Sequence, residues 1–469
     1  MNGGMTRREL LKYGLYSGLA SGMSLNLCLS GCGKRSRGKD ERPNILLISL
    51  DTVRRDHCST YGYERATTPN LAVVAKQGTS FDLAYAPTST TGPTHATIFT
   101  SLYPIAHGVV KNGLILSAKH ETLAEILRRT GYQTCSIVSS FVLHSKFGYA
   151  QGFTHYDDSF PHPESTVKLQ AWDGHHVEEA FDRRAYYATS RAIRWLKERR
   201  DPNRPFFLFV HYFDPHDPYT PPGVFAGRFA PGEASEDSLE KNIGLYDGEI
   251  AFTDQEVGNL LSSLEWIGLE DETLVVVFSD HGEGLMDHGH MNHGVDIYEE
   301  AVRVPLLFRW PNRVPQGRVT SAPVGLVDLA PTILDLVGIG AGGGSFQGRS
   351  LAGSISGETA LDPERPIYLY RRHCEEGYRQ DVWVKGEKFG IRAGVWKYIE
   401  GREEGTKELF NLESDPRETT NLYDAAPEKA DELGSQLEGW VRAHMRARSV
   451  QGRIPKEDLS RLRKIGYVK

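Results

Sequence analysis

The sequence predicts an α/β fold: a doubly wound, mostly parallel sheet with helices on both faces, followed by a small C-terminal antiparallel α+β subdomain. Two observations predict the sheet: continuous apolar runs recur along the chain, and helix-like segments lie between these runs. A third observation predicts the subdomain: beyond a glycine-rich linker at residues 338–344, short strand-like segments follow one another directly. We therefore expect one domain over residues 43–340 and a second over residues 365–469.

The first expected strand is NILLISL, at residues 44–50. It is apolar along its whole length, which is typical of a parallel strand buried on both faces. The same pattern predicts further strands at residues 135–138, 206–212, 274–278 and 304–308. The sequence predicts helices at residues 121–129, 176–199, 250–266 and 326–337. Gly131 and Gly268 follow two of these helices, and glycine commonly stands just beyond a helix end.

The C-terminal part has a different pattern. Strands are expected at residues 366–372, 382–391 and 395–399, and a helix at residues 427–445. Short connections join strands in antiparallel fashion, so we expect a small antiparallel sheet packed beside the core.

The composition excludes several classes of protein. The 469 residues are 39% hydrophobic and 25% charged, which is typical of a globular protein. The net charge of −7 argues against nucleic-acid binding, which needs clustered Lys and Arg to neutralise phosphates. The five cysteines are too few and too widely spaced for a disulfide framework or a C-x-x-C metal site.

The first thirty residues predict an export signal. A twin arginine at residues 7–8 precedes a weakly apolar run at residues 13–29, which is too short and too polar to remain a membrane span. This arrangement resembles a twin-arginine signal, a route that carries folded cargo. The sequence LSGC at residues 29–32 resembles a bacterial lipobox.

These resemblances imply a processed N-terminus. We expect an export and lipoprotein signal at residues 1–31, lipidation of Cys32, and a tether at residues 32–42. The protein would then be an exported bacterial protein, periplasmic or on the cell surface, with a lipid anchor in a membrane.

Potential metal ligands follow two of the expected strands. Asp51 comes directly after the first strand, and Asp280 and His281 follow the strand at residues 274–278. Ligands of open α/β sheets bind beyond the carboxyl ends of the strands. An Asp after a strand is often only a turn or a helix cap, but a neighbouring carboxylate and imidazole bind Zn²⁺ or Mn²⁺ well. The two segments together predict a metal site.

A hydroxyl group precedes a further helix start. In the segment PTSTTGPTHAT, Thr91 stands two residues before Pro93, which suits the first turn of a helix. A helix N-terminus offers free N–H groups and the positive end of a dipole, so it favours an anion. A hydroxyl becomes a good nucleophile as an alkoxide, and a metal ion that lowers its pKa favours that form.

Ordered segments over residues 43–340 resemble the sulfatase family of the alkaline phosphatase superfamily. The matching stretches are NILLISLDTVRRDH, TTPNLAVVAKQGTSFDLAYAP, GPTHATIFTSLYPIAHGV, FVHYFDPHDPY, VVVFSDHGEG, HGVDIYEEAVRVPLLFRWP and VDLAPTILDLVG. The tail is also similar, with ELFNLESDPRETTNL and LRKIGYV. The resemblance implies that residues 43–340 form a catalytic domain that hydrolyses ester bonds.

The resemblance also implies roles for single residues. Asp51, Asp280 and His281 match metal ligands of the family, and Thr91 matches the catalytic nucleophile, which also binds the metal. His95 stands where many members carry an Arg that orients this nucleophile.

Three further residues are expected near the substrate. His216 matches a histidine that contacts the anionic group of the substrate, and His293 is expected to approach the same group. Lys111 is expected either to reach the substrate anion or to form a turn.

The sequence departs from the family pattern at three places. Typical members have C-x-P-x-R or S-x-P-x-R, and the Cys or Ser is oxidised to formylglycine, but Thr91 cannot form that aldehyde. The segment at residues 138–142 lacks the Lys and His that usually bind sulfate. Asp280-His281 replaces the usual Asp-Asn, and this single imidazole favours Zn²⁺ or Mn²⁺ over Ca²⁺, although Ca²⁺ remains open.

Other residues allow two interpretations. His288 and His290 are either ligands of a second metal or exposed loop residues. His211 is equally compatible with a core position and with a site position. Glu283 is expected to cap a helix, with proton transfer as the alternative.

Together these observations predict a metal-dependent ester hydrolase of the sulfatase family. Thr91 would attack a sulfate ester or a phosphoester of a small molecule or glycan and form a covalent intermediate. His95 and His216 would orient the anion. The alternatives are a phosphodiesterase or phosphotransferase similar to phosphoglycerol and phosphoethanolamine transferases, and a non-catalytic binding protein with a sulfatase fold.

Overall fold

The computed structural model describes residues 42–160, 182–229, 238–340, 346–379 and 382–445. The predicted signal, Cys32 and nearly all of the tether therefore lie outside the described residues. The start of the helix expected at residues 176–199, part of the glycine-rich linker and the end of the tail also lie outside them. No helix within the described ranges is both long enough and apolar enough to cross a bilayer.

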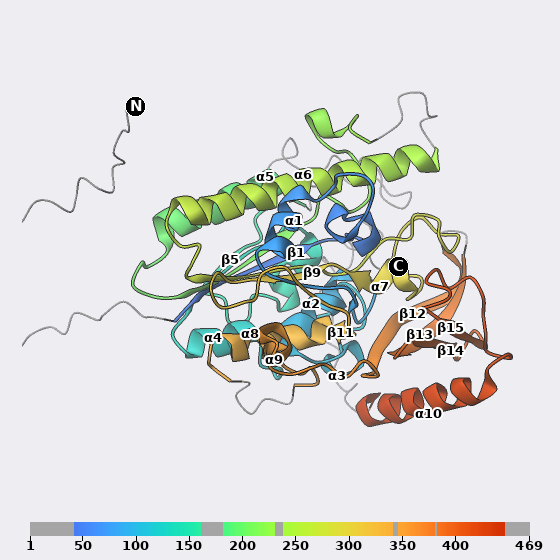
Figure 1. Cartoon of the computed structure of the whole chain (residues 1–469). Helices are drawn as coiled ribbons and strands as arrows, with labels where there is room; N and C mark the ends of the chain where they lie inside the picture. The colour runs from blue at the N-terminus through green and yellow to red at the C-terminus, as the bar shows by residue number, and fades with distance from the viewer. Residues whose placement is uncertain (1–41, 161–181, 230–237, 341–345, 380–381, 446–469) are drawn as a thin grey trace, which may run out of the picture. The chain divides into compact units, whose positions relative to one another are not determined.

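An eight-stranded sheet forms the centre of the fold, in the order β10-β2-β9-β7-β1-β6-β4-β5 (Figure 1). Its strands are β1 (Asn44–Leu50), β2 (Thr79–Phe81), β4 (Gln133–Ile137), β5 (His155–Asp157), β6 (Phe206–Tyr212), β7 (Thr273–Ser279), β9 (Leu306–Arg309) and β10 (Arg318–Thr320). Strand β9 runs antiparallel to both of its neighbours, and all other neighbouring pairs are parallel. The predicted doubly wound, mostly parallel sheet is confirmed.

Helices cover both faces of this sheet (Figure 1). One face carries α1 (Pro69–Lys76), α5 (Ala185–Arg194) and α6 (Leu239–Trp266), and the other carries α2 (Thr91–Thr100), α4 (Leu123–Arg129) and α8 (Leu329–Leu336). Each face has its own apolar core, because the buried side chains of these helices fall into two separate clusters. Shorter helices are α3 (Pro104–His107), α7 (Glu299–Val302) and α9 (Ala352–Ser356).

Local chemistry explains the limits of several elements. Thr122 and Glu125 form a capping box, in which each side chain accepts a hydrogen bond from the backbone N–H of the other, so α4 begins just after Thr122. Pro305 interrupts the strand expected at residues 304–308, because proline has no N–H to donate. The chain there forms β8 (Arg303–Val304), which pairs with β3 (Ala84–Tyr85) in a small sheet with β11 (Val324–Gly325), and then β9.

Two helices differ from the prediction. Helix α6 begins at Leu239 instead of residue 250, since Gly244 and Gly248 weaken the helical signal of its first turns. Gly248 is needed there, because a Cβ atom would lie 2.7 Å from the backbone oxygen of Phe225. Helix α5 begins at Ala185 and continues as a π-helix over Trp195–Arg199, and the chain at residues 182–184 is not helical.

The C-terminal part forms an antiparallel sheet, as predicted. It consists of β12 (Ile367–Arg379), β13 (Val382–Ala393), β14 (Trp396–Gly401) and β15 (Thr406–Asn411), paired in sequence order. Helix α10 (Pro427–His444) packs against this sheet through an apolar cluster that includes Leu433 and Leu437 (Figure 1). Strand β15 is an addition to the prediction, because its sequence TKELFN has only two consecutive apolar residues.

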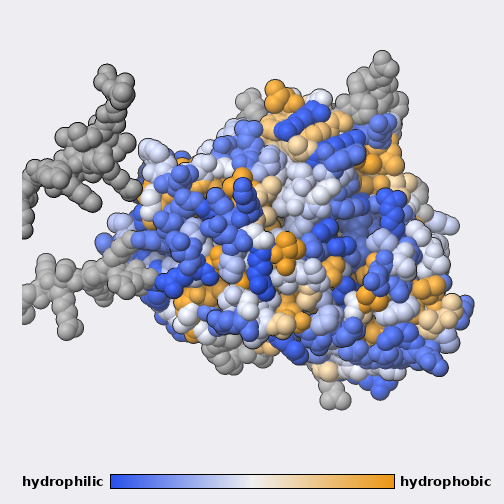
Figure 2. Space-filling model, in the orientation of Figure 1, coloured by the Kyte–Doolittle hydropathy of each residue, from blue (hydrophilic) through white to orange (hydrophobic). Residues whose placement is uncertain are grey.

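The surface agrees with a globular protein. The face shown in Figure 2 is mainly hydrophilic, with apolar residues scattered across it. Trp266 is one of the large exposed apolar residues, and Lys197 lies 4.1 Å from the centre of its ring.

The sheet order positions the predicted site. Strand β1 lies between β6 and β7 and is parallel to both, and Leu50 is level with Ser279. Asp51 and Asp280 are therefore the next residues of two adjacent strands. Their backbone is fixed as well, since Asp280 N donates to Leu50 O at 3.1 Å and Asp51 N donates to Tyr212 O at 2.9 Å.

Candidate active site

Three predicted metal ligands lie together at the carboxyl ends of β1 and β7. Asp51, Asp280 and His281 are fully buried, and one donor atom from each lies within 4.8 Å of the other two. Nε2 of His281 is 3.7 Å from Oδ1 of Asp51 and 3.6 Å from Oδ2 of Asp280. The parallel register of the two strands produces this cluster.

The donor atoms of this cluster fit a bound cation. Both carboxylate oxygens of Asp51 and Oδ2 of Asp280 are buried and accept no hydrogen bond from the described residues. Buried polar atoms normally have a partner, so these three oxygens need a charge to balance them. Nδ1 of His281 donates to the backbone oxygen of Gly282 at 2.9 Å, which leaves the lone pair of Nε2 facing the carboxylates.

Electrostatics agree with this interpretation. Burial raises the pKa of Asp51 to about 7, although the nearby His281 opposes the shift. Burial and the charge of Asp51 also raise the pKa of Asp280. Burial alone would lower the pKa of His281, but the two carboxylates outweigh it and raise the pKa overall. Without a cation, the cluster therefore holds protons that metal binding would release.

Thr91 is the first residue of α2 and reaches the same cluster. Its Oγ1 atom is fully buried and lies 3.2 Å from Nε2 of His281, to which the hydroxyl can donate a hydrogen bond. The first turn of α2 is held from two sides, because Gly92 N donates to Oδ1 of Asn112 at 2.8 Å and Tyr149 donates to Gly92 O at 2.8 Å. The sequence does not indicate that Asn112 and Tyr149 hold this turn, because these contacts depend on the path of distant loops.

His95 lies one turn along α2 from Thr91 and faces the core. Its Nδ1 atom donates to Thr91 O at 2.8 Å, and its Nε2 atom accepts from Oγ of Ser49 at 3.0 Å. The ring packs against Phe209 and Phe278, and burial lowers its pKa to about 3. The structure therefore places His95 behind Thr91, where a neutral ring supports the first turn of α2.

His211 is a member of the site that the sequence left undecided. It lies near the end of β6, fully buried, with Nε2 3.3 Å from Oδ2 of Asp51. Burial lowers its pKa to about 4, so the ring is neutral near pH 7. His95, His211 and Asp280 form a second group of donors within 4.8 Å of one another, but both ring nitrogens of His95 already have partners.

His216 and His293 approach the cluster from the other predicted segments. The ring of His293 lies 4.5 Å from that of His281 and 4.8 Å from that of His216, measured between centres. Nδ1 of His216 donates to Asp217 O at 2.7 Å, and Nδ1 of His293 lies 3.1 Å from Oε1 of Glu283. Burial lowers the pKa of both histidines well below the usual range.

The role expected for Glu283 is corrected by the structure. No helix begins at this residue, and its side chain is fully buried. Its carboxyl group accepts a hydrogen bond from Tyr219 at 3.2 Å and faces His293, so it fixes the orientation of that ring. Burial raises the pKa of Glu283 to about 7.

Lys111 is not joined to the cluster by any contact among the described residues. It is half-buried in the loop after α3, next to Asn112, and forms neither a hydrogen bond nor an ion pair within the described ranges. Its expected contact with the substrate stays a prediction.

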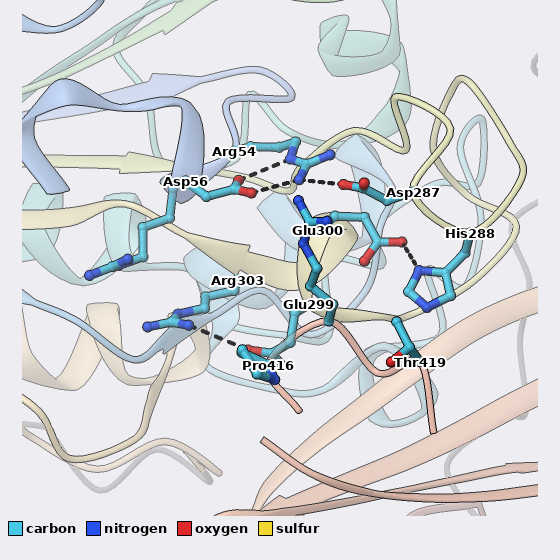
Figure 3. A pocket seen from close by; sticks show the side chains of 11 residues that line it. Arg54, Asp56, Asp287, His288, Glu299, Glu300, Arg303, Pro416 and Thr419 are labelled. Atoms are coloured by element: carbon cyan, nitrogen blue, oxygen red, sulfur yellow. Dashed lines mark hydrogen bonds and ion pairs between the residues drawn. The ribbon is translucent and has the colours of Figure 1, made fainter. Parts of the chain in front are cut away.

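His288 and His290 are both bonded to carboxylates. Nδ1 of His288 lies 2.6 Å from Oε1 of Glu300 (Figure 3), and His290 is paired with Asp296. His290, Asp296 and Glu300 have donor atoms within 4.8 Å of one another. These pairs give the two rings a structural explanation, and a second metal at His288 and His290 stays a prediction.

Figure 3 shows a pocket of about 310 Å³ beside these pairs. Most of the charged groups that it draws are paired with one another: Arg54 with Asp56 and Asp287, and His288 with Glu300. Arg54 also donates to the backbone oxygen of Glu283 at 3.3 Å. Arg54 therefore joins the lining of this pocket to the loop that follows His281 and helps to hold that loop.

Known proteins resemble the chain over most of its length. A sequence model described as Sulfatase matches residues 43–339, and one described as N-sulphoglucosamine sulphohydrolase, C-terminal, matches residues 287–445. An N-acetylglucosamine-6-O-sulfatase of Bacteroides thetaiotaomicron is 26% identical over 88% of this chain and 88% of its own length. An arylsulfatase of Clostridium perfringens is 26% identical over 82% of this chain and 91% of its own length.

Solved structures share the fold. A structure in complex with its substrate D-glucosamine-2-N,6-O-disulfate has a TM-score of 0.69 and 24% identity, and the match covers 86% of this chain and 98% of that one. A phosphonate monoester hydrolase of Agrobacterium radiobacter has a TM-score of 0.70 and 23% identity, over 87% of this chain and 96% of that one.

Proposed function

The chain belongs to the sulfatase family of the alkaline phosphatase superfamily, whose members hydrolyse sulfate esters, and we propose that it does so through an unmodified Thr91 beside one divalent metal ion. One observation supports this most strongly. The buried Oγ1 of Thr91 lies 3.2 Å from Nε2 of His281, next to carboxylate oxygens that have no hydrogen-bond partner among the described residues.

The metal would be held by Asp51, Asp280 and His281, with Thr91 beside it. A divalent ion bound there would lower the pKa of an adjacent hydroxyl and balance the negative charge of the bound ester. Two carboxylates and one imidazole favour Zn²⁺ or Mn²⁺, and Ca²⁺ is the alternative.

The reaction would proceed in two displacement steps at Thr91. Oγ1 of Thr91 loses its proton and forms a bond to sulfur or phosphorus, while the bond from that atom to the alcohol oxygen breaks. The rings of His216 and His293, which burial keeps neutral, are the candidate groups to take up the proton that Thr91 loses and to pass it to the departing alcohol oxygen. Water then cleaves the ester on Thr91, which releases sulfate or phosphate and restores the hydroxyl.

The remaining residues would position these groups. His95 holds the first turn of α2 through Thr91 O, and Glu283 orients His293. His216 and His293 would contact the anionic oxygens, and Lys111 would add a positive charge at the edge of the site.

We propose a small-molecule or glycan ester as the substrate. The similarity to the N-acetylglucosamine-6-O-sulfatase favours a sulfated sugar. Threonine cannot become formylglycine, so the enzyme would work without that modification, and a plain hydroxyl nucleophile also suits phosphoesters. A phosphodiesterase or phosphotransferase is therefore the second candidate, supported by the fold shared with a phosphonate monoester hydrolase.

Substitution of Thr91 tests the proposal. Thr91→Ala should lower turnover at least about 10³-fold, on the scale reported for loss of a covalent nucleophile, and Thr91→Ser should keep part of the activity. The assay compares aryl sulfate, aryl phosphate and bis-aryl phosphate, and mass spectrometry checks that Thr91 is unmodified. Wild-type rates in Thr91→Ala would exclude this nucleophile. A wild-type protein that binds the metal but turns over none of the three esters would support a non-catalytic binding protein.

We further propose that the protein is exported and anchored through a lipid on Cys32. The order of the twin arginine, the apolar run and the sequence LSGC supports this proposal. Cys32→Ser should move the protein from the membrane fraction to the soluble exported fraction. A wild-type protein that is already in the soluble fraction and keeps Met1 would contradict it.

A further inference from the structure

Strand β12 of the C-terminal sheet passes alongside the loop that carries His293. Arg371 donates to the backbone oxygen of Val295 at 3.1 Å, and the apolar side chains of Cys374 and Val295 belong to one buried cluster. The strand is thus fixed to this loop on both sides of Arg372.

Arg372 has little to neutralise its charge. Among the described residues, its guanidinium group forms one hydrogen bond, from Nε to the backbone oxygen of Gly294 at 3.5 Å, and no ion pair with a carboxylate. The neighbouring Arg371 is different, because Glu404 lies 2.7 Å from it. Arg372 is half-buried, whereas Arg371 is almost fully buried.

This unpaired charge borders the reaction centre. A Cβ atom placed on Gly294 would lie 3.8 Å from Nε of Arg372 and 3.4 Å from Cγ2 of Thr90. Thr90 directly precedes the nucleophile, and His293 directly precedes Gly294. Gly294 therefore lies between Arg372 and the segment that contains Thr91. The guanidinium group of Arg372 is thus close to the candidate active site but is not part of the cluster formed by Asp51, Asp280 and His281.

We propose that Arg372 binds a second anionic group of the substrate, on the same molecule as the ester that is cleaved. This inference rests on the proposed function and narrows its substrate to esters with an additional sulfate or carboxylate. A guanidinium group suits such a partner, because it forms two parallel charge-assisted hydrogen bonds with carboxylate-like oxygens. In the proposed function, the metal site and two histidines surround the ester group that is cleaved. Arg372 would therefore bind a different part of the substrate.

The experiment compares a singly and a doubly charged sugar. The aryl ester that the wild type turns over best reports activity, and D-glucosamine-6-sulfate and D-glucosamine-2-N,6-O-disulfate serve as competing ligands. In the wild type, the disulfate should inhibit at least about tenfold more strongly than the monosulfate, which corresponds to about 1.4 kcal/mol. Arg372→Ala should remove this difference, because it weakens binding of the disulfate more than binding of the monosulfate.

Two further variants sharpen the test. Arg372→Lys keeps the charge but loses the paired geometry, so it should keep only part of the preference. Arg379→Ala removes an arginine at the far end of the same strand and should keep all of it. Thermal unfolding of each variant shows that the fold is retained.

Three results would overturn the proposal. They are a wild type without preference for the disulfate, an unchanged preference in Arg372→Ala, and an equal loss of aryl-ester turnover and of affinity for both sugars in that variant. If the wild type has no esterase activity, the proposed function fails separately. Calorimetric titration of the two sugars into the same metal-loaded proteins then decides whether Arg372 binds the second group.

Discussion

The carboxyl group of Asp51 would link the proposed metal binding to pH. Its pKa in the folded protein is about 7, raised from the usual value near 4 by burial. Between these two values, the folded protein without metal keeps a proton that the unfolded chain has lost. This carboxyl group therefore favours folding at low pH, and its contribution is lost as the pH rises through 7. A bound cation would replace the proton.

We predict that metal affinity falls as the pH falls below 7, by at least about tenfold per pH unit, because at least one proton must leave the site. Calorimetric titration of Zn²⁺ into the metal-free protein at pH 6, 7 and 8 measures the slope. Asp280→Asn removes one ligand and should bind far more weakly at every pH. An affinity that does not change between pH 6 and 8 would mean that Asp51 is not a ligand.

Only some residues of the candidate site could be predicted from the sequence. Asp51, Asp280 and His281 were predictable because the ends of parallel strands meet at one edge of the sheet, and the structure brings them together. The site position of His211 was not predictable, because the local sequence of a histidine near the end of an apolar strand does not distinguish a core position from a site position. Glu283 was assigned wrongly, since a local helix signal says nothing about the distant Tyr219 and His293 that it contacts.

At the scale of elements, the first turn of α2 is packed so closely that a methyl group at position 92 would displace two side chains. A Cβ atom there would lie 2.9 Å from Oδ1 of Asn112 and 3.0 Å from the hydroxyl of Tyr149. Both atoms hold the turn that presents Thr91, so a small clash would move the hydroxyl group of that residue.

We predict that Gly92→Ala lowers turnover at least about tenfold and destabilises the protein by about 1 to 3 kcal/mol, the usual range for overpacking. Gly439→Ala is the matched control, because Gly439 lies in α10 with open space at its Cβ position. That change should stabilise the protein by about 0.5 to 1 kcal/mol and leave turnover unaltered. Urea unfolding and aryl-ester assays measure both, and equal behaviour of the two variants would contradict the prediction.

Element boundaries were predictable where the signal is local. Strands β1 and β6 match the apolar runs at residues 44–50 and 206–212, because each run is buried along its whole length. Strand β12 extends to Arg379, beyond the predicted end at residue 372, because its pairing with β13 continues through polar residues. Such pairing between strands is a tertiary contact, which the apolar pattern of one segment does not contain.

At the scale of the whole molecule, a buried ionic group joins the C-terminal sheet to the catalytic part. Lys397 of β14 is fully buried, with Nζ 3.2 Å from Oε1 of Glu299 in α7 and 2.9 Å from Oε1 of Glu418. Burial raises the pKa of Glu418 to about 8, against the effect of Lys397. The two carboxyl groups therefore share this ammonium group, and Glu299 has a second, longer ion pair with Arg303 at 4.0 Å.

We predict that Lys397→Met destabilises the protein by about 3 to 5 kcal/mol, the usual loss when one partner of a buried ion pair is removed. Lys429→Met is the control, because Lys429 pairs with Glu432 at the surface of α10, and its loss should change stability by less than about 1 kcal/mol. Chemical unfolding at pH 7 measures the difference. Similar midpoints for the two variants would show that Lys397 does not hold the parts together.

The sheet order also determines when the central sheet can form during translation. Strand β1 pairs with β6 and β7, and β7 ends at Ser279. A ribosome that adds about 5 to 20 residues per second needs roughly 14 to 56 s to reach that residue. During this interval the N-terminal signal that the sequence predicts would already have emerged from the ribosome, while β1 would still lack a neighbouring strand. A channel that transports only unfolded chain would begin export before the sheet has formed. A route that carries folded proteins, as the twin arginine predicts, would let translation and folding finish first, and the proposed metal ion could bind before export.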